Sequence, residues 1–191
     1  MTAWFITHPD VVIDLAVPVP DWPLSPCGRE RMDAALALPW AACIGAVWCS
    51  AERKARDGAD ILAAGLGLPV TVLPELGEND CSATGYLPRA EFEAVADEFF
   101  AHPGRSVRGW ERAVDAQRRI VGAVDTVLAA TPDGAGVAIV SHGGVGTLLL
   151  CHLNGVPVGR EHDQPGSNGG NYFAFDRRTR AVLHGWRVVD G

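Results

Sequence analysis

The sequence predicts an α/β fold in which helices are layered on a largely parallel β-sheet. Short apolar runs that end in turn residues alternate with stretches of helical periodicity along most of the chain. Strands that alternate with helices are typical of such layered folds. The length of 191 residues predicts one domain, residues 1–191, and an apolar fraction of 48% is enough for a sizeable core.

Six apolar runs are predicted as strands. Four of them alternate with helical patterns, at residues 3–6, 44–48, 70–73 and 137–140. Two more, at residues 171–175 and 181–188, follow one another near the end of the chain. Runs of this length and composition between turn residues are typical of buried strands.

Five helices are expected between or after these runs, at residues 25–38, 51–64, 89–100, 110–130 and 145–153. Ser25 is a good N-cap for the first helix, and Pro26 is tolerated in its first turn. Gly65 is expected to end the second helix. The fourth pattern is the strongest, because its apolar residues recur at three- and four-residue spacing with charges elsewhere.

Two histidines follow predicted strands that are far apart in the sequence. His8 lies in Thr7-His8-Pro9, and His142 follows Ser141 and is followed by two glycines. The carboxyl ends of strands form the ligand crevices of open α/β sheets, so we expect the two imidazoles to converge. A helix that starts just after His142 would also present backbone N–H groups to an anion. The alternative is a tight turn with a core histidine.

Two further segments carry polar residues after predicted strands. Arg53, Lys54 and Arg56 lie in the first turn of a helix, where cations oppose the helix dipole. Anion binding would explain them, and a solvated charged turn is the alternative. Glu78 lies in a loop at the same predicted sheet edge, where a carboxyl group could act as general acid and base.

These pieces together resemble the histidine phosphatase superfamily, also called the phosphoglycerate mutase-like family. The similar segments cover nearly the whole chain in the order of the family's motifs. They are Phe5-Ile6-Thr7-His8, Trp22-Pro23-Leu24-Ser25 with Gly28-Arg29, Ser50 through Ala55 with Gly58-Ala59, Leu76-x-Glu78, Gly109-Trp110-Glu111 with Arg118-Arg119, and Ser141-His142-Gly143-Gly144-Val145. The last of these is the most specific.

The resemblance implies a three-layer α/β/α sandwich with a mostly parallel sheet, and phosphoryl transfer through a phosphohistidine. His8 would be the nucleophile, and Glu78 would protonate the leaving oxygen and then activate water. His142 would be the third catalytic residue. Phosphate would be bound by four further residues, Thr7, Arg53, Lys54 and Gly143. The resemblance implies no metal and no cofactor, and its ligand is a small phosphomonoester or inorganic phosphate.

Two segments depart from the family's pattern. The first motif usually reads Arg-His-Gly, and here Thr7 and Pro9 flank His8. Lys54 stands where the second anion-binding segment usually has an arginine. Lysine keeps the charge but lacks the planar bidentate donor of a guanidinium. Loss of one such contact to transition-state charge costs about 3 kcal/mol, or roughly 10²- to 10³-fold in rate. Two functions therefore stay open, a phosphatase and a family member that binds a phosphorylated ligand or a protein partner without turnover.

Another arginine could compensate for the lost guanidinium, and the sequence does not decide which one. The candidates are Arg29, Arg53, Arg56 and Arg160. The loop at residues 160–165 and the turn at 169–171 are interpreted either as walls of the crevice or as a mobile surface loop.

Composition and motifs argue against several other classes of protein. A formal charge of −7 does not favour a nucleic-acid or membrane-surface partner. Five cysteines without a C-x-x-C pair predict reduced thiols, and the first residues show no basic leader, so we expect a cytoplasmic protein. Ile139 stands where a serine-hydrolase elbow needs glycine. Six tryptophans leave room for an apolar contact surface, so a homodimer is possible.

Overall fold

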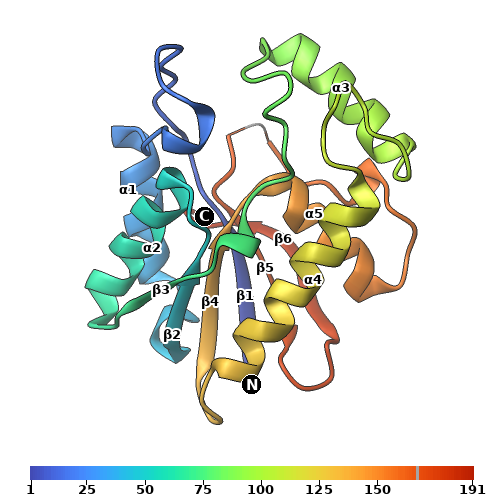
Figure 1. Cartoon of the computed structure of the whole chain (residues 1–191). Helices are drawn as coiled ribbons and strands as arrows, with labels where there is room; N and C mark the ends of the chain where they lie inside the picture. The colour runs from blue at the N-terminus through green and yellow to red at the C-terminus, as the bar shows by residue number, and fades with distance from the viewer. Residues whose placement is uncertain (167) are drawn as a thin grey trace.

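The computed structural model describes residues 1–166 and 168–191, and its strands form one six-stranded sheet in the order β3-β2-β4-β1-β5-β6 (Figure 1). The strands are β1 (Thr2–Thr7), β2 (Ile44–Cys49), β3 (Val70–Val72), β4 (Gly136–Ser141), β5 (Asn171–Asp176) and β6 (Val182–Val188). The first four along the chain are parallel, and β5 runs antiparallel to both β1 and β6. The predicted mostly parallel sheet is confirmed.

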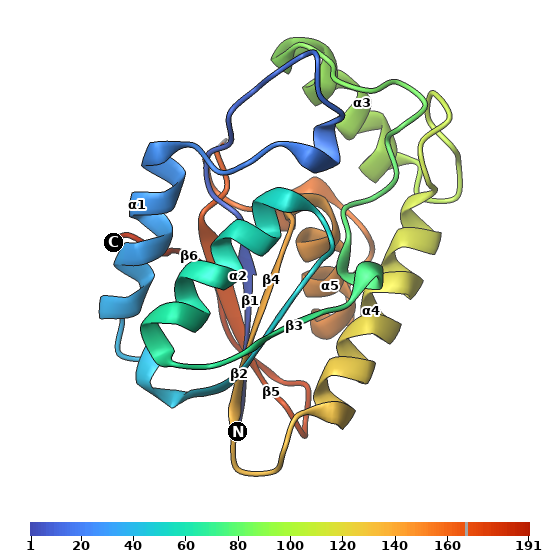
Figure 2. The same cartoon turned by 60° about the vertical axis from the view of Figure 1, so that its left-hand side comes forward.

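Helices cover both faces of this sheet (Figure 2). They are α1 (Pro26–Ala34), α2 (Arg53–Leu66), α3 (Arg89–Ala101), α4 (Ala113–Ala130) and α5 (Gly143–Asn154). Successive β1 side chains point to opposite faces. Trp4 and Ile6 pack in the core under α1 and α2, whereas Ala3 and Phe5 pack in the core under α4 and α5. The expected three-layer α/β/α sandwich is confirmed.

Several helix ends differ from the prediction by a few residues; helix α4, for example, begins at Ala113 and not at Trp110. Helix α2 continues through Gly65 and ends before Gly67, which has a positive φ of 67° and caps the helix with its backbone N–H. A Cβ at Gly65 would lie 2.4 Å from Leu36 Cδ1, so this glycine allows close packing and does not stop the helix. Helix α1 is shorter than expected, although the N-cap is confirmed because Ser25 Oγ accepts from Gly28 N at 3.0 Å.

The register of the parallel strands places the predicted site residues at one edge. Thr7 at the end of β1 pairs with Ser141 at the end of β4, and Cys49 at the end of β2 pairs with Val140. The residues that follow these strands therefore leave the sheet side by side. Helix α3 and the 77–88 segment lie above this edge, opposite the loop at residues 9–23 (Figure 1).

Candidate active site

The two histidines meet at the carboxyl edge of the sheet. The ring centroids of His8 and His142 are 5.1 Å apart, with an interplanar angle of 70°. His8 also donates its backbone N–H to Ser141 O at 3.1 Å, which ties the end of β1 to the end of β4. The convergence expected from the strand ends is present.

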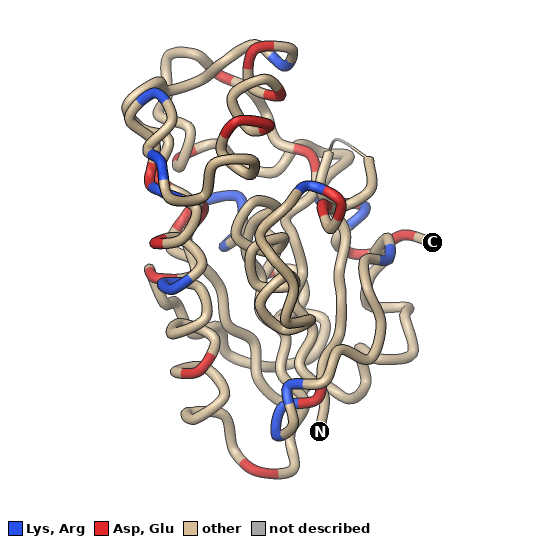
Figure 3. The backbone as a smooth tube through the Cα atoms, turned by 90° about the vertical axis from the view of Figure 1, so that its right-hand side faces the viewer, with Lys and Arg blue, Asp and Glu red and all other residues tan. Residues whose placement is uncertain are grey.

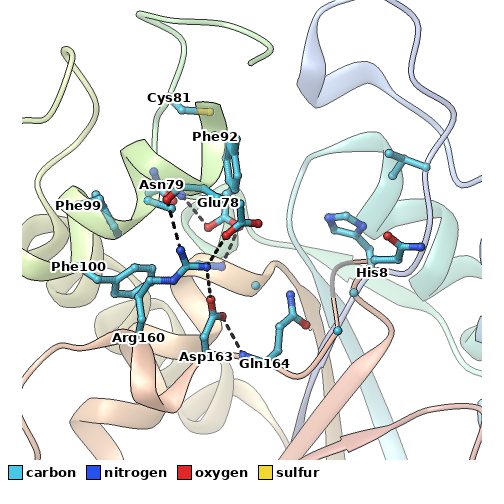
Figure 4. A pocket seen from close by; sticks show the side chains of 18 of the residues that line it. His8, Glu78, Asn79, Cys81, Phe92, Phe99, Phe100, Arg160, Asp163 and Gln164 are labelled. Carbon is cyan, nitrogen blue, oxygen red and sulfur yellow. Dashed lines mark hydrogen bonds and ion pairs between the residues drawn. The ribbon is translucent and has the colours of Figure 1, made fainter. Parts of the chain in front are cut away.

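His8 is oriented as a nucleophile would have to be. Its Nδ1 lies 2.9 Å from Pro9 O, and because a carbonyl oxygen only accepts, Nδ1 carries the proton. The opposite nitrogen, Nε2, therefore has the lone pair. Burial and the nearby charge of Lys54 lower the pKa of His8 from 6.5 to about 4, so the imidazole is neutral near pH 7. His8 lines a cavity of about 390 Å³ (Figure 4).

Glu78 lines the same cavity and is held at the start of α5. Its two carboxyl oxygens accept from Gly144 N at 3.0 Å and from Val145 N at 2.9 Å. Burial raises the pKa of Glu78, and this effect outweighs the backbone N–H groups that favour the carboxylate. A raised pKa favours the protonated form that a general acid needs.

His142 is completely buried behind His8 and is not part of the cavity wall. Its Nε2 lies 2.7 Å from Ser50 Oγ and 3.2 Å from Glu52 Oε1. Burial lowers the pKa of His142 well below 6.5, although the Glu52 carboxylate opposes this. In this arrangement His142 contacts Ser50 and Glu52 and supports His8 from behind.

Glu52 is the site residue that the sequence analysis missed. Its Oε2 lies 2.5 Å from Lys54 Nζ, and its Oε1 accepts from Glu78 N at 2.9 Å. Burial raises the pKa of Glu52, but His142 and Lys54 outweigh it and hold the pKa at about 2. Glu52 is therefore ionised and neutralises Lys54, the residue predicted to bind phosphate. The segment that begins at Ser50 was interpreted as cationic. Its one carboxylate, that of Glu52, was the feature of the sequence that could have indicated an ion pair with Lys54.

The other predicted phosphate ligands divide between the cavity and its surroundings. Gly143 lines the cavity. Thr7 is buried and donates from Oγ1 to Gln164 Oε1 at 2.7 Å. Arg53 does not reach the cavity, because its side chain is 59% exposed and binds Asp57 at 2.7 Å. For Arg53 the alternative of a solvated charged turn describes the structure better than phosphate binding.

The arginines expected to compensate for Thr7 are also bound to carboxylates or exposed. Arg29 lies 3.8 Å from Asp57, and Arg56 is on the exposed face of α2. Arg160 lines the cavity, but its guanidinium is held by three carboxylates, those of Glu93 at 2.8 Å, Asp97 at 2.6 Å and Asp163 at 3.2 Å. Figure 4 shows Arg160 beside Asp163. Basic and acidic positions are interspersed along the backbone in Figure 3, in keeping with this pairing.

The rest of the cavity wall comes from loops and from α3. Aromatic side chains on this side are Phe92, Phe99, Phe100 and Trp110, and the loop after β1 adds Val11 and Ile13. Of these residues the sequence analysis named only Trp110, as part of a family-like segment. The three phenylalanines of α3 were not singled out, because helical periodicity alone does not distinguish a core face from a cavity wall. In residues 1–166 and 168–191, no three His, Cys, Asp or Glu side chains are grouped so that they could hold a metal ion.

Comparison with models of protein families shows to which family the chain belongs. The model of the histidine phosphatase superfamily (branch 1) matches residues 14–185. The chain belongs to this superfamily. The matched residues include Glu78 and His142 and begin after His8, which lies in the divergent Thr7-His8-Pro9 segment. No curated protein matches the sequence.

Solved structures share the fold over nearly the full length of the chain. Bacillus stearothermophilus YhfR superposes with a TM-score of 0.78 at 22% identity, covering 96% of this chain and 94% of that chain. A mycobacterial glucosyl-3-phosphoglycerate phosphatase in complex with inorganic phosphate superposes with a TM-score of 0.75 at 22% identity, covering 100% and 99%. In the part of the chain that the structure describes, no helix is long and apolar enough to cross a membrane.

Proposed function

We propose that this histidine phosphatase hydrolyses a small phosphomonoester through a phosphohistidine on His8. The observation that carries the proposal is the shared cavity of His8 and Glu78, in which a neutral imidazole faces a carboxyl group of raised pKa. A nucleophile with a free lone pair and a nearby proton donor are the two groups that this reaction needs.

The reaction has two steps that use the same two residues. The Nε2 lone pair of His8 forms a bond to phosphorus while the ester P–O bond breaks, and Glu78 gives its proton to the leaving oxygen. The Glu78 carboxylate then takes a proton from water, whose oxygen attacks phosphorus and breaks the P–N bond. Inorganic phosphate leaves, and both residues regain their starting protonation states.

The relatives support the phosphate-binding part of this proposal. The mycobacterial phosphatase of the same fold was solved with inorganic phosphate and with VO3. Membership of the histidine phosphatase superfamily supports hydrolase chemistry for the chain as a whole.

A second function has its own supporting observation. The charge of Lys54 is neutralised by Glu52 at 2.5 Å, and position 7 carries a hydroxyl where the family usually has a guanidinium. A cavity with so little free positive charge binds a phosphate dianion weakly. A family member that binds a phosphorylated ligand without turnover is therefore the alternative.

Hydrolysis of a broad phosphomonoester panel separates the two functions. Wild type, His8→Ala and His102→Ala are purified identically, the last as a control because His102 is exposed and outside the cavity. The proposed hydrolase predicts turnover by wild type and by His102→Ala, and none by His8→Ala. Turnover that survives in His8→Ala contradicts the assignment of His8. No turnover above buffer in any of the three proteins favours the alternative function.

A further inference from the structure

The side chain of Gln164 is fixed at the end of β1 by two residues of the sheet. Its Oε1 accepts from Thr7 Oγ1 at 2.7 Å and from Asn171 Nδ2 at 3.1 Å. Thr7 Oγ1 in turn accepts from the backbone N–H of Asn171 at 3.0 Å. Two acceptors lie near the hydroxyl proton, and Gln164 Oε1 at 2.7 Å is closer than Asn171 O at 3.3 Å. These contacts assign the amide oxygen of Gln164 to the sheet side and its nitrogen to the opposite side.

The amide nitrogen of Gln164 faces the cavity. Gln164, Gly143 and His8 all line it, and Figure 4 shows the side chain of Gln164 projecting into the space between His8 and Glu78. A Cβ on Gly143 would lie only 2.2 Å from Gln164 Nε2. The glycine at the start of α5 therefore makes room for this amide, and Nε2 lies directly over the first turn of the helix.

The backbone of Gln164 is anchored independently of its side chain. Its N–H donates to Asp163 Oδ1 at 2.8 Å, and the same oxygen accepts from Thr147 Oγ1 at 2.9 Å. Asp163 Oδ2 lies 3.2 Å from Arg160. Arg160 thus supports the loop that carries Gln164. Hydrogen bonds at both ends hold the amide in one orientation before any ligand binds, which favours a preorganised donor.

We propose, on the basis of the function proposed above, that Gln164 Nε2 donates a hydrogen bond to an oxygen of the phosphoryl group transferred to His8. Gln164 then supplies a neutral contact where the family usually has the guanidinium before the histidine. Thr7 acts as a positioning residue, because its hydroxyl orients the amide. An arginine at position 7 has donors only and would leave the backbone N–H of Asn171 without the acceptor that Thr7 Oγ1 provides.

Kinetics of wild type and four variants test this role with the best substrate of the panel. Gln164→Leu removes the donor, Gln164→Glu replaces it with an oxygen, and Thr7→Val removes the orienting hydroxyl, while Thr7→Ser keeps it. We expect kcat to fall about 10²- to 10³-fold in both Gln164 variants, with a smaller change in KM. Thr7→Val should lose about 10-fold in kcat, and Thr7→Ser should stay within about 3-fold of wild type. Thermal melting of each variant reports whether the fold is intact.

The outcomes distinguish this inference from the proposed function. Gln164→Leu with a kcat within about 3-fold of wild type, while His8 is still required, overturns the role of Gln164 alone. If wild type shows no His8-dependent turnover, the proposed function fails, and calorimetry with inorganic phosphate decides the role of Gln164. At least 10-fold weaker binding to Gln164→Leu than to wild type then supports the donor role. Equal affinity, or no binding to wild type, overturns it.

Discussion

Replacement of Glu52 by glutamine tests the electrostatics of the site without reference to any substrate. The Glu52 carboxylate lies 2.5 Å from Lys54 Nζ, and the side chains of the two residues are only 17% and 7% exposed. In Glu52→Gln the Lys54 ammonium keeps its charge in this buried position but loses its counter-ion. Loss of one member of a buried pair destabilises a fold because the remaining charge is uncompensated.

The size of the effect follows from the pKa of Glu52. The difference between its ordinary value of 4.5 and its value of about 2 in the fold corresponds to about 3 kcal/mol of unfolding free energy. The folded state favours the ionised form, so this stabilisation is fully present above pH 4.5 and is lost as the pH falls towards 2. The unfolding free energy of wild type should therefore exceed that of Glu52→Gln by about 3 kcal/mol at pH 7 and by less than half of that at pH 3.

Urea unfolding of wild type and Glu52→Gln at pH 7 and at pH 3 measures this difference. Glu91→Gln is the matched control, because Glu91 pairs with Arg108 at 2.5 Å but both side chains are about half exposed. A pair at the surface contributes under about 1 kcal/mol, so the control should stay close to wild type at both pH values. A Glu52→Gln effect that is equal at pH 7 and pH 3, or no larger than that of the control, would refute the reasoning.

Two other predictions concern the pH profile and the loop that holds His8. Because burial and Lys54 lower the pKa of His8 to about 4, the acid limb of kcat/KM that belongs to the enzyme should lie near pH 4. The second pKa of a phosphomonoester is about 6, so a limb near pH 6.5 contradicts this when it stays in place between substrates whose second pKa differs. The basic limb should follow loss of the proton from Glu78, whose pKa is raised by burial, and should be absent from the residual rate of Glu78→Gln. Gly169→Ala should lower the melting temperature and the turnover rate, because Gly169 has a φ of 63° and a Cβ there would lie 2.0 Å from His8 O. Gly134 also has a positive φ, but a Cβ there would have no atom within 4 Å, so Gly134→Ala adds backbone strain without a clash. An equal fall in melting temperature for the two variants would therefore contradict a specific clash at His8.

The sheet and its functional edge could be predicted from local sequence patterns. Each strand is a short apolar run between turn residues, and parallel strands end at one edge, so His8 and His142 could be placed together before the structure was known. Glu78 could be placed near them for the same reason. Helix ends were predicted less well, because Gly65 is retained inside α2 by packing against Leu36, a contact that no local pattern contains.

The partners of the site residues could not be predicted from the sequence. Thr7 and Gln164 are separated by 157 positions, and only the fold brings the hydroxyl to the amide. Arg53 and Lys54 are neighbours in the sequence, but adjacent helical residues point about 100° apart, so Arg53 is exposed while Lys54 is buried. Pairing of Lys54 with Glu52 likewise depends on side-chain geometry, and it neutralises the charge that Lys54 was expected to offer to a phosphate.

The most direct test of the proposed function is detection of a phosphoryl group on His8. Wild type is mixed with the best panel substrate, quenched at alkaline pH where phosphohistidine survives, and digested for mass spectrometry, with His8→Ala treated in parallel. We expect a phosphorylated peptide that contains residue 8 in wild type and no phosphorylated peptide in His8→Ala. Rapid turnover without any phosphorylation of His8, or the same label in both proteins, would contradict the phosphohistidine mechanism.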